Sequence, residues 1–265
     1  MDYLLVGLEE IYENNSSTRR KIRMTTNLYG IGVGVGDPTQ LTLKAINTLK
    51  ELDVIIVPEA KKDEGSTAYE ITKEYLKDDI EVVVMEFKML PDPKDRMEGR
   101  KINTKIIESL LDEGKNIGFL TIGDPMTYST YVHILDNLED EYMDRVKTIS
   151  GISSFVDISG RLNLPLVMGD EDLKIISLNK NTDIEKEISN NDNIVFMKVK
   201  RNFEKLKEVL IKTNNIDKII MVSNSGKENE IVYFDISNLE KENVPYFTTM
   251  IFKKQGVEKW KKFIS

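Results

Sequence analysis

The feature that most constrains the fold is an alternation, from Asn27 onward, of short apolar runs with segments whose apolar residues recur at helical spacing. Runs such as DVIIVP are apolar almost throughout, which is typical of strands covered on both faces of a sheet. The segment before that run carries, on one helical face, Leu41, Ala45, Leu49 and Leu52. Strands that alternate with helices in this way predict an α/β fold built on parallel sheets.

The same alternation restarts after residues 141–145. Strands are expected in RVKTIS, LKIISL, NIVFMKV and KIIMVSN, with helices between them. Two further runs, EIVYFDI and YFTTMIF, have no helix between them, so the second sheet is expected to become antiparallel at one edge. We therefore predict two α/β domains, 27–143 and 144–265, preceded by an appendage over 1–26 whose polar and basic stretch favours a loosely docked tail.

One helix of the first domain is long enough for its buried face to be predicted. Residues 100–113 have helical periodicity, and Gly114 follows as a stop signal. The apolar positions expected to face the core are Ile102, Ile106 and Leu110.

The composition excludes several classes of protein. The 265 residues include no cysteine and one histidine, His133, so thiolate metal sites, cysteine nucleophiles and multi-histidine metal sites are excluded. A net charge of −8 disfavours binding to the phosphates of nucleic acid. No apolar run approaches the roughly 20 residues of a membrane span, and the N-terminus lacks the cationic region of a secretory signal. We expect a cytoplasmic protein with no protein-bound metal, no nucleic-acid partner and no membrane contact.

The first expected strand ends in an unusual glycine segment, Gly30-Ile-Gly32-Val-Gly34-Val-Gly36, followed by Asp37-Pro38. Glycines at every second position leave one face of the strand bare, so something large can approach the backbone. A tight strand-to-helix turn alone would need one or two glycines. The spacing does not match the dinucleotide-binding pattern G-x-G-x-x-G, and no Gly-Lys-Ser/Thr follows as in a nucleotide-binding phosphate loop.

Two further loops follow expected strands. The segment 121–130, TIGDPMTYST, ends a buried strand, and its Asp124 is expected to cap a helix with Pro125 at the first helical position. Capping does not explain the glycine or the run of hydroxyls, so this loop is expected to face a ligand. The segment 149–154, ISGISS, opens the next helix, where free backbone N–H groups can bind polar ligand atoms and the serines can also serve as ordinary caps.

Three segments together resemble the signature regions of the tetrapyrrole methylases, a family of S-adenosylmethionine-dependent enzymes of cobalamin, sirohaem and related pathways. The segments are LYGIGVGVGDPTQLTLKAINTLKELDVIIVP, GFLTIGDPMTYST and ISGISSFVDISGRLNLPLVMGDEDLKII. Within the family they are most similar to the C20-methyltransferases of precorrin-2 and cobalt-factor II. The resemblance implies two α/β domains with the cofactor between them. Val35 and Ser150 stand where the common family loops carry proline, which is expected to alter loop rigidity more than chemistry.

The resemblance also implies which residues contact each ligand. Those expected at S-adenosylmethionine are Ile122, Gly123, Asp124, Thr127, Ser153, Ser154, Met197, Asn224 and Gly226. Those expected at the tetrapyrrole are Gly34, Gly36, Asp37, Lys88 and Arg100. Lys88 and Arg100 belong to a wider basic set, after strand ends, of Lys61, Lys62, Lys88, Arg96, Arg100 and Lys101. A local basic lining is needed because an acidic protein repels a substrate with many carboxylates, although any one of these residues is also consistent with a solvated surface position.

The C20 carbon of a partly reduced tetrapyrrole is itself nucleophilic, so the protein has to align carbon, methyl and sulfur and to exclude water. A proton then leaves C20, and Glu59 or Tyr128 is positioned to accept it. A solvated loop acid is the alternative interpretation of Glu59, and packing or capping is the expected role of His133.

The resemblance therefore implies methyl transfer from S-adenosylmethionine to C20 of precorrin-2 or cobalt-factor II. Other reactions stay open, including methylation at C11, at C17 or of uroporphyrinogen. A tetrapyrrole-binding protein without turnover is an alternative of another class. Members of the family usually pair, so a homodimer is expected.

Overall fold

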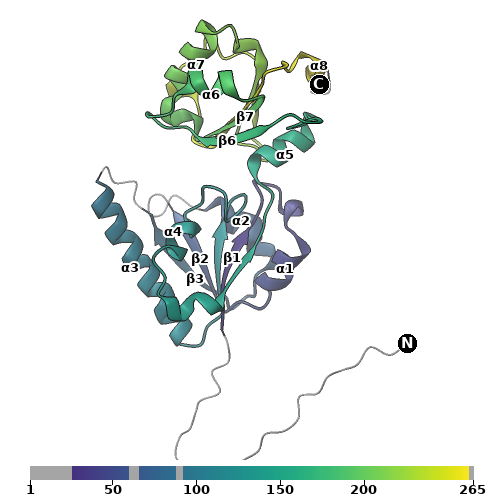
Figure 1. The fold of residues 1–265 in the computed structure, drawn as a ribbon. Helices are drawn as coiled ribbons and strands as arrows, with labels where there is room; N and C mark the ends of the chain where they lie inside the picture. The colour runs from purple at the N-terminus through teal and green to yellow at the C-terminus, as the bar shows by residue number, and fades with distance from the viewer. Residues whose placement is uncertain (1–25, 60–65, 88–91, 263–265) are drawn as a thin grey trace, which may run out of the picture.

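The computed structural model describes residues 26–59, 66–87 and 92–262. Figure 1 shows two bodies, each built around one twisted sheet, with the chain passing from the first body to the second just before helix α5 (Ser154–Arg161). Most of the expected appendage, and the basic residues Lys61, Lys62 and Lys88, lie outside the described residues. Thr26 is described and buried, and it accepts hydrogen bonds from the Arg145 guanidinium, so the anchored chain begins one residue before the expected boundary.

The first sheet is parallel and has five strands in the order β3-β2-β4-β1-β5. They are β1 (Leu28–Gly32), β2 (Val54–Glu59), β3 (Glu81–Glu86), β4 (Ile117–Thr121) and β5 (Val146–Ile149). The strand β5 was expected to open the second domain, but it pairs with β1 and completes the first sheet. The chain therefore leaves the first sheet after Ile149, and β1 lies between β4 and β5, where its glycine segment faces the ends of both neighbours.

Two pairs of helices cover the opposite faces of the first sheet (Figure 1). One face carries α1 (Leu43–Leu49) and α2 (Thr67–Thr72), and the other carries α3 (Pro93–Asp112) and α4 (Tyr131–Leu135). The apolar stripe predicted on the first helical segment is confirmed, because all four of its side chains are buried. Short 3-10 turns at Pro38–Gln40, Lys73–Tyr75 and Asp140–Arg145 complete this half.

The face predicted for α3 is largely wrong. Ile102 and Ile106 are 56% and 42% exposed, whereas Ile107 and Leu111 are buried beside Leu110 in the core against β4. The helix also begins at Pro93, capped by the Asp92 carboxylate, well before residue 100. Both stripes of α3 carry large aliphatic residues at helical spacing, so periodicity alone does not identify the one that faces the sheet.

The second sheet has the order β6-β7-β10-β8-β9. Its strands are β6 (Leu173–Ser177), β7 (Asn193–Met197), β8 (Ile219–Ser223), β9 (Ile231–Tyr233) and β10 (Thr248–Lys253). The expected antiparallel edge is present as β9, but β10 is antiparallel as well and lies in the middle, between β7 and β8. The last strand in the sequence therefore occupies the centre of this sheet, which the sequence pattern did not indicate.

Helices also cover both faces of the second sheet. The helices α6 (Ile184–Asn190) and α7 (Phe203–Lys212) pack on one face, and α5 and α8 (Glu258–Lys261) lie on the other. Short 3-10 turns occur at Val199–Asn202 (η4), Ile216–Lys218 and Lys241–Asn243. Within the ranges that the structure describes, no helix is long and apolar enough to span a bilayer.

Candidate functional site

The bare face of the glycine segment is filled by the protein's own atoms. A Cβ on Gly30 would lie 2.2 Å from the Tyr131 ring, which is fully buried against this strand. A Cβ on Gly32 would lie 2.5 Å from the Gly151 nitrogen and 2.6 Å from the Gly123 oxygen. The glycines thus let other parts of the chain approach β1 closely, as expected for a bare face, but what approaches is a tyrosine ring and backbone.

Backbone hydrogen bonds hold the glycine segment to the loop after β4. The Val33 N–H donates to the Thr121 carbonyl at 2.9 Å, and the Gly123 N–H donates to the Gly34 carbonyl at 2.8 Å. Gly34 and Gly123 have φ values of +75° and +74°, which L side chains rarely adopt. These two positions require glycine for their backbone conformation, and together they bring the first two candidate loops side by side.

Asp124 joins the third loop to the other two. One of its carboxylate oxygens accepts from the Met126 N–H at 2.9 Å, and the other accepts from the Gly151 N–H at 3.2 Å. The prediction that Asp124 caps a helix is wrong, because residues 124–130 form turns and α4 begins only at Tyr131. The carboxylate instead closes a turn and fixes the start of the segment that leads to α5.

The end of β4 carries an unsatisfied polar atom. Among the described residues, the Thr121 hydroxyl is the buried side-chain polar atom without a hydrogen-bond partner, and the residue is 6% exposed. A buried hydroxyl without a partner is costly, so such an atom points to a missing ligand or water. Its position directly before Ile122-Gly123-Asp124 fits the polar cofactor that the family resemblance implies, and so does the absence of a side chain at Gly123.

The predicted residues of the second domain lie close to one another. Ser153 is buried, and its Cα lies 3.7 Å from the position of a Cβ on Gly123. Ser153 occupies the N-cap position of α5, but its hydroxyl makes no capping hydrogen bond. The Ser154 hydroxyl shares a hydrogen bond of 3.0 Å with Thr249, which stands opposite Met197 in the register of β10 and β7. Gly123, both serines and Met197 therefore come together from three separate segments.

The loop after β8 carries the remaining cofactor candidates. Asn224 has a φ of +54°, and its N–H donates to the Phe247 carbonyl at 2.7 Å. Gly226 also has a positive φ, +74°, and its carbonyl oxygen lies 2.3 Å from the position of a Cβ on Gly36. This loop of the second domain is thus packed directly on the glycine segment of the first, which places both strand-end loops at the domain junction.

A charged network, which the sequence reasoning missed, holds the same junction. Buried Asp157 on α5 accepts hydrogen bonds from Gln40 Nε2 at 2.6 Å, Ser225 Oγ at 2.7 Å and Arg161 Nε at 2.9 Å. Arg161 also forms a bidentate pair with Glu230, which accepts from the Gly226 N–H at 2.8 Å. The spacing of Asp157 and Arg161, one helical turn apart on an apolar helix, is the signal that could have revealed it.

Tyr128 connects the domains at another point. Its hydroxyl donates to the Ile175 carbonyl at 3.0 Å, and its own carbonyl accepts from Lys198 Nζ at 3.3 Å. Tyr128 and Lys198 both have left-handed backbones, with φ of +52° and +56°. Thr127 donates its N–H to the Asp124 carbonyl at 3.3 Å, and Ile122 packs on the core under α1 and α2. The whole segment 121–130 is therefore fixed from both domains.

The other predicted residues lie outside the group of loops that meet at the domain junction, or at its edge. Glu59 is the last residue of β2 and is 9% exposed, so its interpretation as a solvated loop acid is wrong. It stands opposite Glu86 of β3, on the far side of β4 from the glycine segment. Asp37 is exposed, and hydrogen bonds from Thr39 lower the pKa of its carboxyl. Arg100 lies on α3, where burial and the neighbouring Arg96 lower the pKa of its guanidinium.

His133 on α4 is half-buried. Burial and the positive charges of Arg100 and Lys198 lower the pKa of its imidazole, while the Asp136 carboxylate opposes that shift. Among the residues that the structure describes, no group of three or more histidine, aspartate or glutamate side chains is gathered to hold a metal ion.

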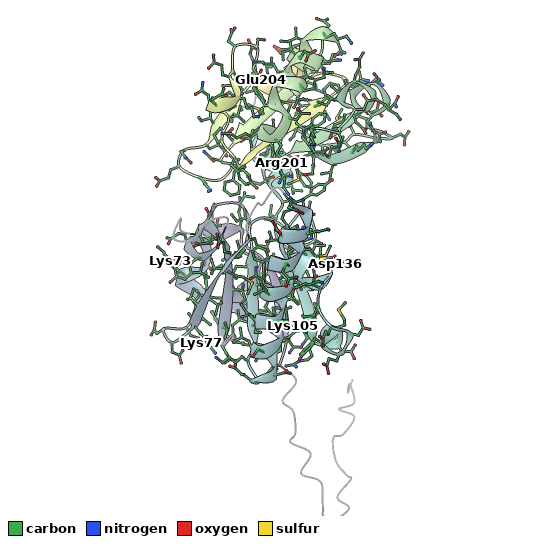
Figure 2. All side chains as sticks on the ribbon, turned by 90° about the vertical axis from the view of Figure 1, so that its left-hand side faces the viewer. Lys73, Lys77, Lys105, Asp136, Arg201 and Glu204 are labelled. Atoms are coloured by element: carbon green, nitrogen blue, oxygen red, sulfur yellow. The ribbon has the colours of Figure 1, made fainter. Side chains whose placement is uncertain are left out.

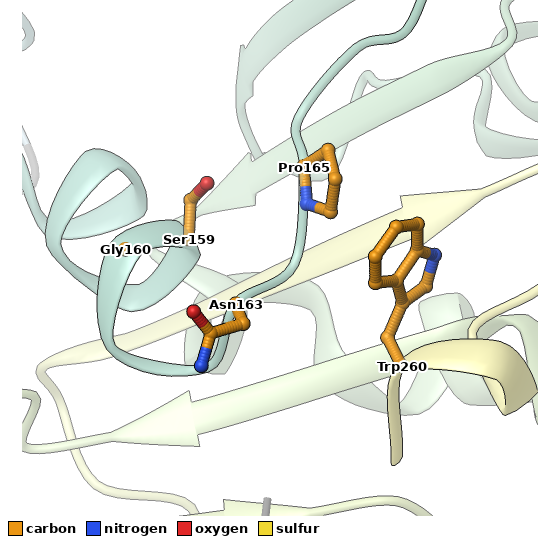
Figure 3. Close-up of a pocket in the computed structure, with 5 residues that line it drawn as sticks. All are labelled: Ser159, Gly160, Asn163, Pro165 and Trp260. Carbon is orange, nitrogen blue, oxygen red and sulfur yellow. The ribbon is translucent and has the colours of Figure 1, made fainter. Parts of the chain in front are cut away.

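A hollow of about 530 Å³ lies elsewhere on the second domain, next to α5 and α8 (Figure 3). It is lined by Ser159, Gly160, Asn163, Pro165 and Trp260. None of these side chains is titratable, and none belongs to the loops that meet at the domain junction. The candidate site is therefore the meeting point of the loops and not this hollow.

Comparison with known proteins agrees with this geometry. A family profile described as Tetrapyrrole (Corrin/Porphyrin) Methylases matches residues 27–240. The chain is 38% identical to the probable cobalt-precorrin-2 C(20)-methyltransferase of Methanocaldococcus jannaschii, over 85% of this chain and 93% of that protein. It is 27% identical to the cobalt-precorrin-2 C(20)-methyltransferase of Salmonella typhimurium, over 88% of this chain and 98% of that protein.

Solved structures share the fold. A cobalt precorrin-4 methyltransferase superposes with a TM-score of 0.66 at 15% identity, over 86% of this chain and 95% of the other. The uroporphyrin-III C-methyl transferase of Thermus thermophilus, complexed with S-adenyl homocysteine, gives a TM-score of 0.62 at 16% identity, over 86% of this chain and 92% of the other. The resemblance of the three loop segments is confirmed, and this chain belongs to the tetrapyrrole methylase family.

Proposed function

We infer that the chain is an S-adenosylmethionine-dependent C-methyltransferase that acts at C20 of precorrin-2 or cobalt-factor II in corrin-ring biosynthesis. The observation that carries this is the 38% identity to a relative named for the C20 reaction, over 85% of the chain. All three loop segments that carry the family resemblance fall within the matched family region. The joined loops at the domain junction support the same function, because they provide close backbone approach and an unsatisfied buried hydroxyl.

S-Adenosylmethionine supplies an electrophilic methyl group on a sulfonium. The residues that would hold it are those around Gly123, Ser153, Ser154, Met197 and the Asn224–Gly226 loop. Since the acceptor carbon is nucleophilic without activation, the main task of these residues is to fix both reactants and to exclude water. The hydrogen bonds that join segment 121–130 to both domains support a pre-organised site of this kind.

Two residues are proposed to take the proton that leaves C20. Tyr128 lies in the cofactor loop, but its hydroxyl is engaged with the Ile175 carbonyl and would have to exchange that partner. Glu59 is the last residue of β2 and is buried, and its carboxylate is the other candidate proton acceptor. Glu59→Gln and Tyr128→Phe separate the two, because the variant that removes the proton acceptor should lower the single-turnover rate while leaving the affinity for S-adenosylhomocysteine unchanged.

The test of the reaction uses purified protein with S-adenosylmethionine labelled in its methyl group. Precorrin-2 and cobalt-factor II are supplied in parallel, and the methylated carbon is identified by NMR. Label at C20 of one substrate is the expected result. Label at C11 or at C17 would assign another reaction, and binding without transfer would indicate a non-catalytic tetrapyrrole carrier.

We also propose that the protein is a homodimer. We further propose that it is located in the cytoplasm and that its partner there is the small-molecule tetrapyrrole substrate. A site formed by loops of two domains gains rigidity from a partner. Sedimentation equilibrium at micromolar concentration should give the mass of two chains of 30.4 kDa each. The mass of one chain would contradict the dimer without affecting the proposed reaction.

A further inference from the structure

Three basic side chains from both domains lie within electrostatic range of one another, and one of them contacts Tyr128. Arg100 comes from α3, His133 from α4 and Lys198 from the start of the η4 turn. The Lys198 ammonium lies 5.9 Å from the centre of the Tyr128 ring, in addition to its hydrogen bond to the Tyr128 carbonyl. Arg96 flanks Arg100, and Arg201 flanks Lys198. Figure 2 shows Arg201 at the end of the second domain that faces the first.

The basic groups of this set act on one another electrostatically. Arg100 and Lys198 both disfavour the charged form of His133, so the three groups lie within electrostatic range. Within the described parts of the chain, no carboxylate comes within ion-pair distance of Arg100, Lys198 or Arg201. Among the described residues, Asp136 is the one carboxylate that raises the pKa of Arg100 and of His133. It forms no ion pair with either of them.

An arrangement of this kind is unfavourable without an anion. Arg100 and Lys198 are partly buried, and burial is the main cause that lowers the pKa of each. Most other lysines and arginines with shifted pKa values are paired with carboxylates, as Lys105 is with Glu108 and Glu139. Since the chain as a whole carries −8, unpaired cations at the domain junction form a local field opposite in sign to that of the protein.

We propose that Arg100, His133 and Lys198, flanked by Arg96 and Arg201, form a subsite for the peripheral carboxylates of the tetrapyrrole. This assignment rests on the proposed function, because it takes the substrate to be a polycarboxylate. It adds His133 of the first domain, and Lys198 and Arg201 of the second, to Arg96 and Arg100, which belong to the basic set predicted from the sequence. Lys198 is placed by its left-handed backbone and by Tyr128, so the subsite is formed only where the two domains meet.

The test uses the full chain and uroporphyrin III, a stable fluorescent porphyrin with eight carboxylates, as the probe. Arg100→Gln, Lys198→Gln and the double variant remove charge from the subsite. Lys77→Gln is the matched control, because Lys77 is exposed and lies toward the far end of the first domain (Figure 2). S-Adenosylhomocysteine affinity, measured by calorimetry, reports whether each variant keeps the cofactor site intact.

Each single variant should weaken porphyrin binding about tenfold, the size of a lost hydrogen bond to a charged group, and the double variant should weaken it further. The salt dependence of binding should become shallower, while Lys77→Gln and the affinity for S-adenosylhomocysteine should not change. Unchanged porphyrin affinity and unchanged KM for the tetrapyrrole in both single variants would overturn the subsite, even if C20 methylation is observed. Charge-dependent porphyrin binding without C20 methylation would instead leave the subsite standing and remove the proposed reaction.

Discussion

The two domains meet on both sides of the first sheet, and the charges on the two sides are arranged differently. On the side of α1 and α2, which we call the paired side, Gln40, Asp157, Arg161 and Glu230 satisfy one another. Lys227 also crosses there, donating to Thr67 Oγ1 at 3.0 Å. On the side of α3 and α4, which we call the open side, Arg100, His133 and Lys198 lack carboxylate partners within the described residues.

The difference suggests that the two sides of the domain junction have different roles, one in holding the domains together and the other in binding a ligand. The paired side has complementary charges and close glycine contacts, so it fixes the position of one domain on the other. The open side has an excess of positive charge without ion-pair partners for Arg100 and Lys198 among the described residues, so it is stabilised when an anion binds. Variants on the two sides should therefore affect different measurements, namely stability on the paired side and ligand affinity on the open side.

The largest effect is expected from Gly36→Ala on the paired side. Its Cβ would lie 2.3 Å from the Gly226 carbonyl oxygen, so the two loops would have to separate. We expect a loss of about 3 kcal/mol in the free energy of unfolding, at the upper end of overpacking costs. Urea denaturation measures this loss. Gly99→Ala is the control, because its Cβ would meet nothing within 4 Å in the exposed part of α3; equal stability of the two variants would break the comparison.

Gly123→Val tests the loop that both sides share. Space is available, since the nearest atom is the Ser153 Cα at 3.7 Å, but a φ of +74° is strained for a β-branched residue. The affinity for S-adenosylhomocysteine should fall by at least ~2 kcal/mol, measured by calorimetry. Gly114→Val introduces the same strain at a φ of +83°, after α3 and away from the three loops. It should lower stability and leave the affinity intact, and equal affinities in the parent and Gly123→Val would mean that the cofactor is placed wrongly.

Asp157→Ala should have a smaller effect on stability. It leaves Gln40, Ser225 and Arg161 without their shared acceptor, although Arg161 is 36% exposed and keeps Glu230. We expect a loss of about 1.5 kcal/mol. Asp157→Asn keeps an acceptor oxygen and should lose less. An unfolding midpoint unchanged in Asp157→Ala would show that the network does not hold the paired side together.

The smallest effect concerns His133 on the open side. Its folded-state pKa is lowered from about 6.5, so the unfolded chain takes up the proton first as the pH falls. The parent should therefore lose a few tenths of a kcal/mol of stability below about pH 6.5, after screening by solvent, and His133→Gln should not show this loss. Thermal unfolding at several pH values measures the difference. A parent that becomes more stable in this range, relative to His133→Gln, would contradict the arrangement of cations around the imidazole.

Much of the fold could be predicted because it depends on local signals. Alternating apolar runs identified the strands, and the three loop segments identified the family. Strand neighbours in the sheet were less predictable, since they depend on pairing between residues far apart in the sequence. The sequence pattern places β5 at the start of the second domain, but β5 pairs with β1. The pattern also places β10 at an edge, but β10 lies in the centre of its sheet.

The candidate site shows the same division between local and distant signals. Glycine positions and loop hydroxyls are visible in the sequence, whereas the partner of each glycine is not. Asp124 carries a capping signal, yet its second oxygen binds Gly151, which is 27 residues away. Lys198 was missed because a lysine in a left-handed turn has no sequence signature, and its role follows only from its contact with Tyr128 in the other domain.

The central position of β10 has a consequence for how the protein is made. Because β10 is the last strand in the sequence, β7 and β8 emerge from the ribosome long before the strand that separates them. Until residue 253 is synthesised, both carry an unpaired edge, and unpaired edges invite association with other chains. The first sheet, by contrast, has all its strands once Ile149 is made. A chain truncated before β10 is therefore expected to aggregate through the unpaired edges of β7 and β8. Its first sheet would still contain all five of its strands.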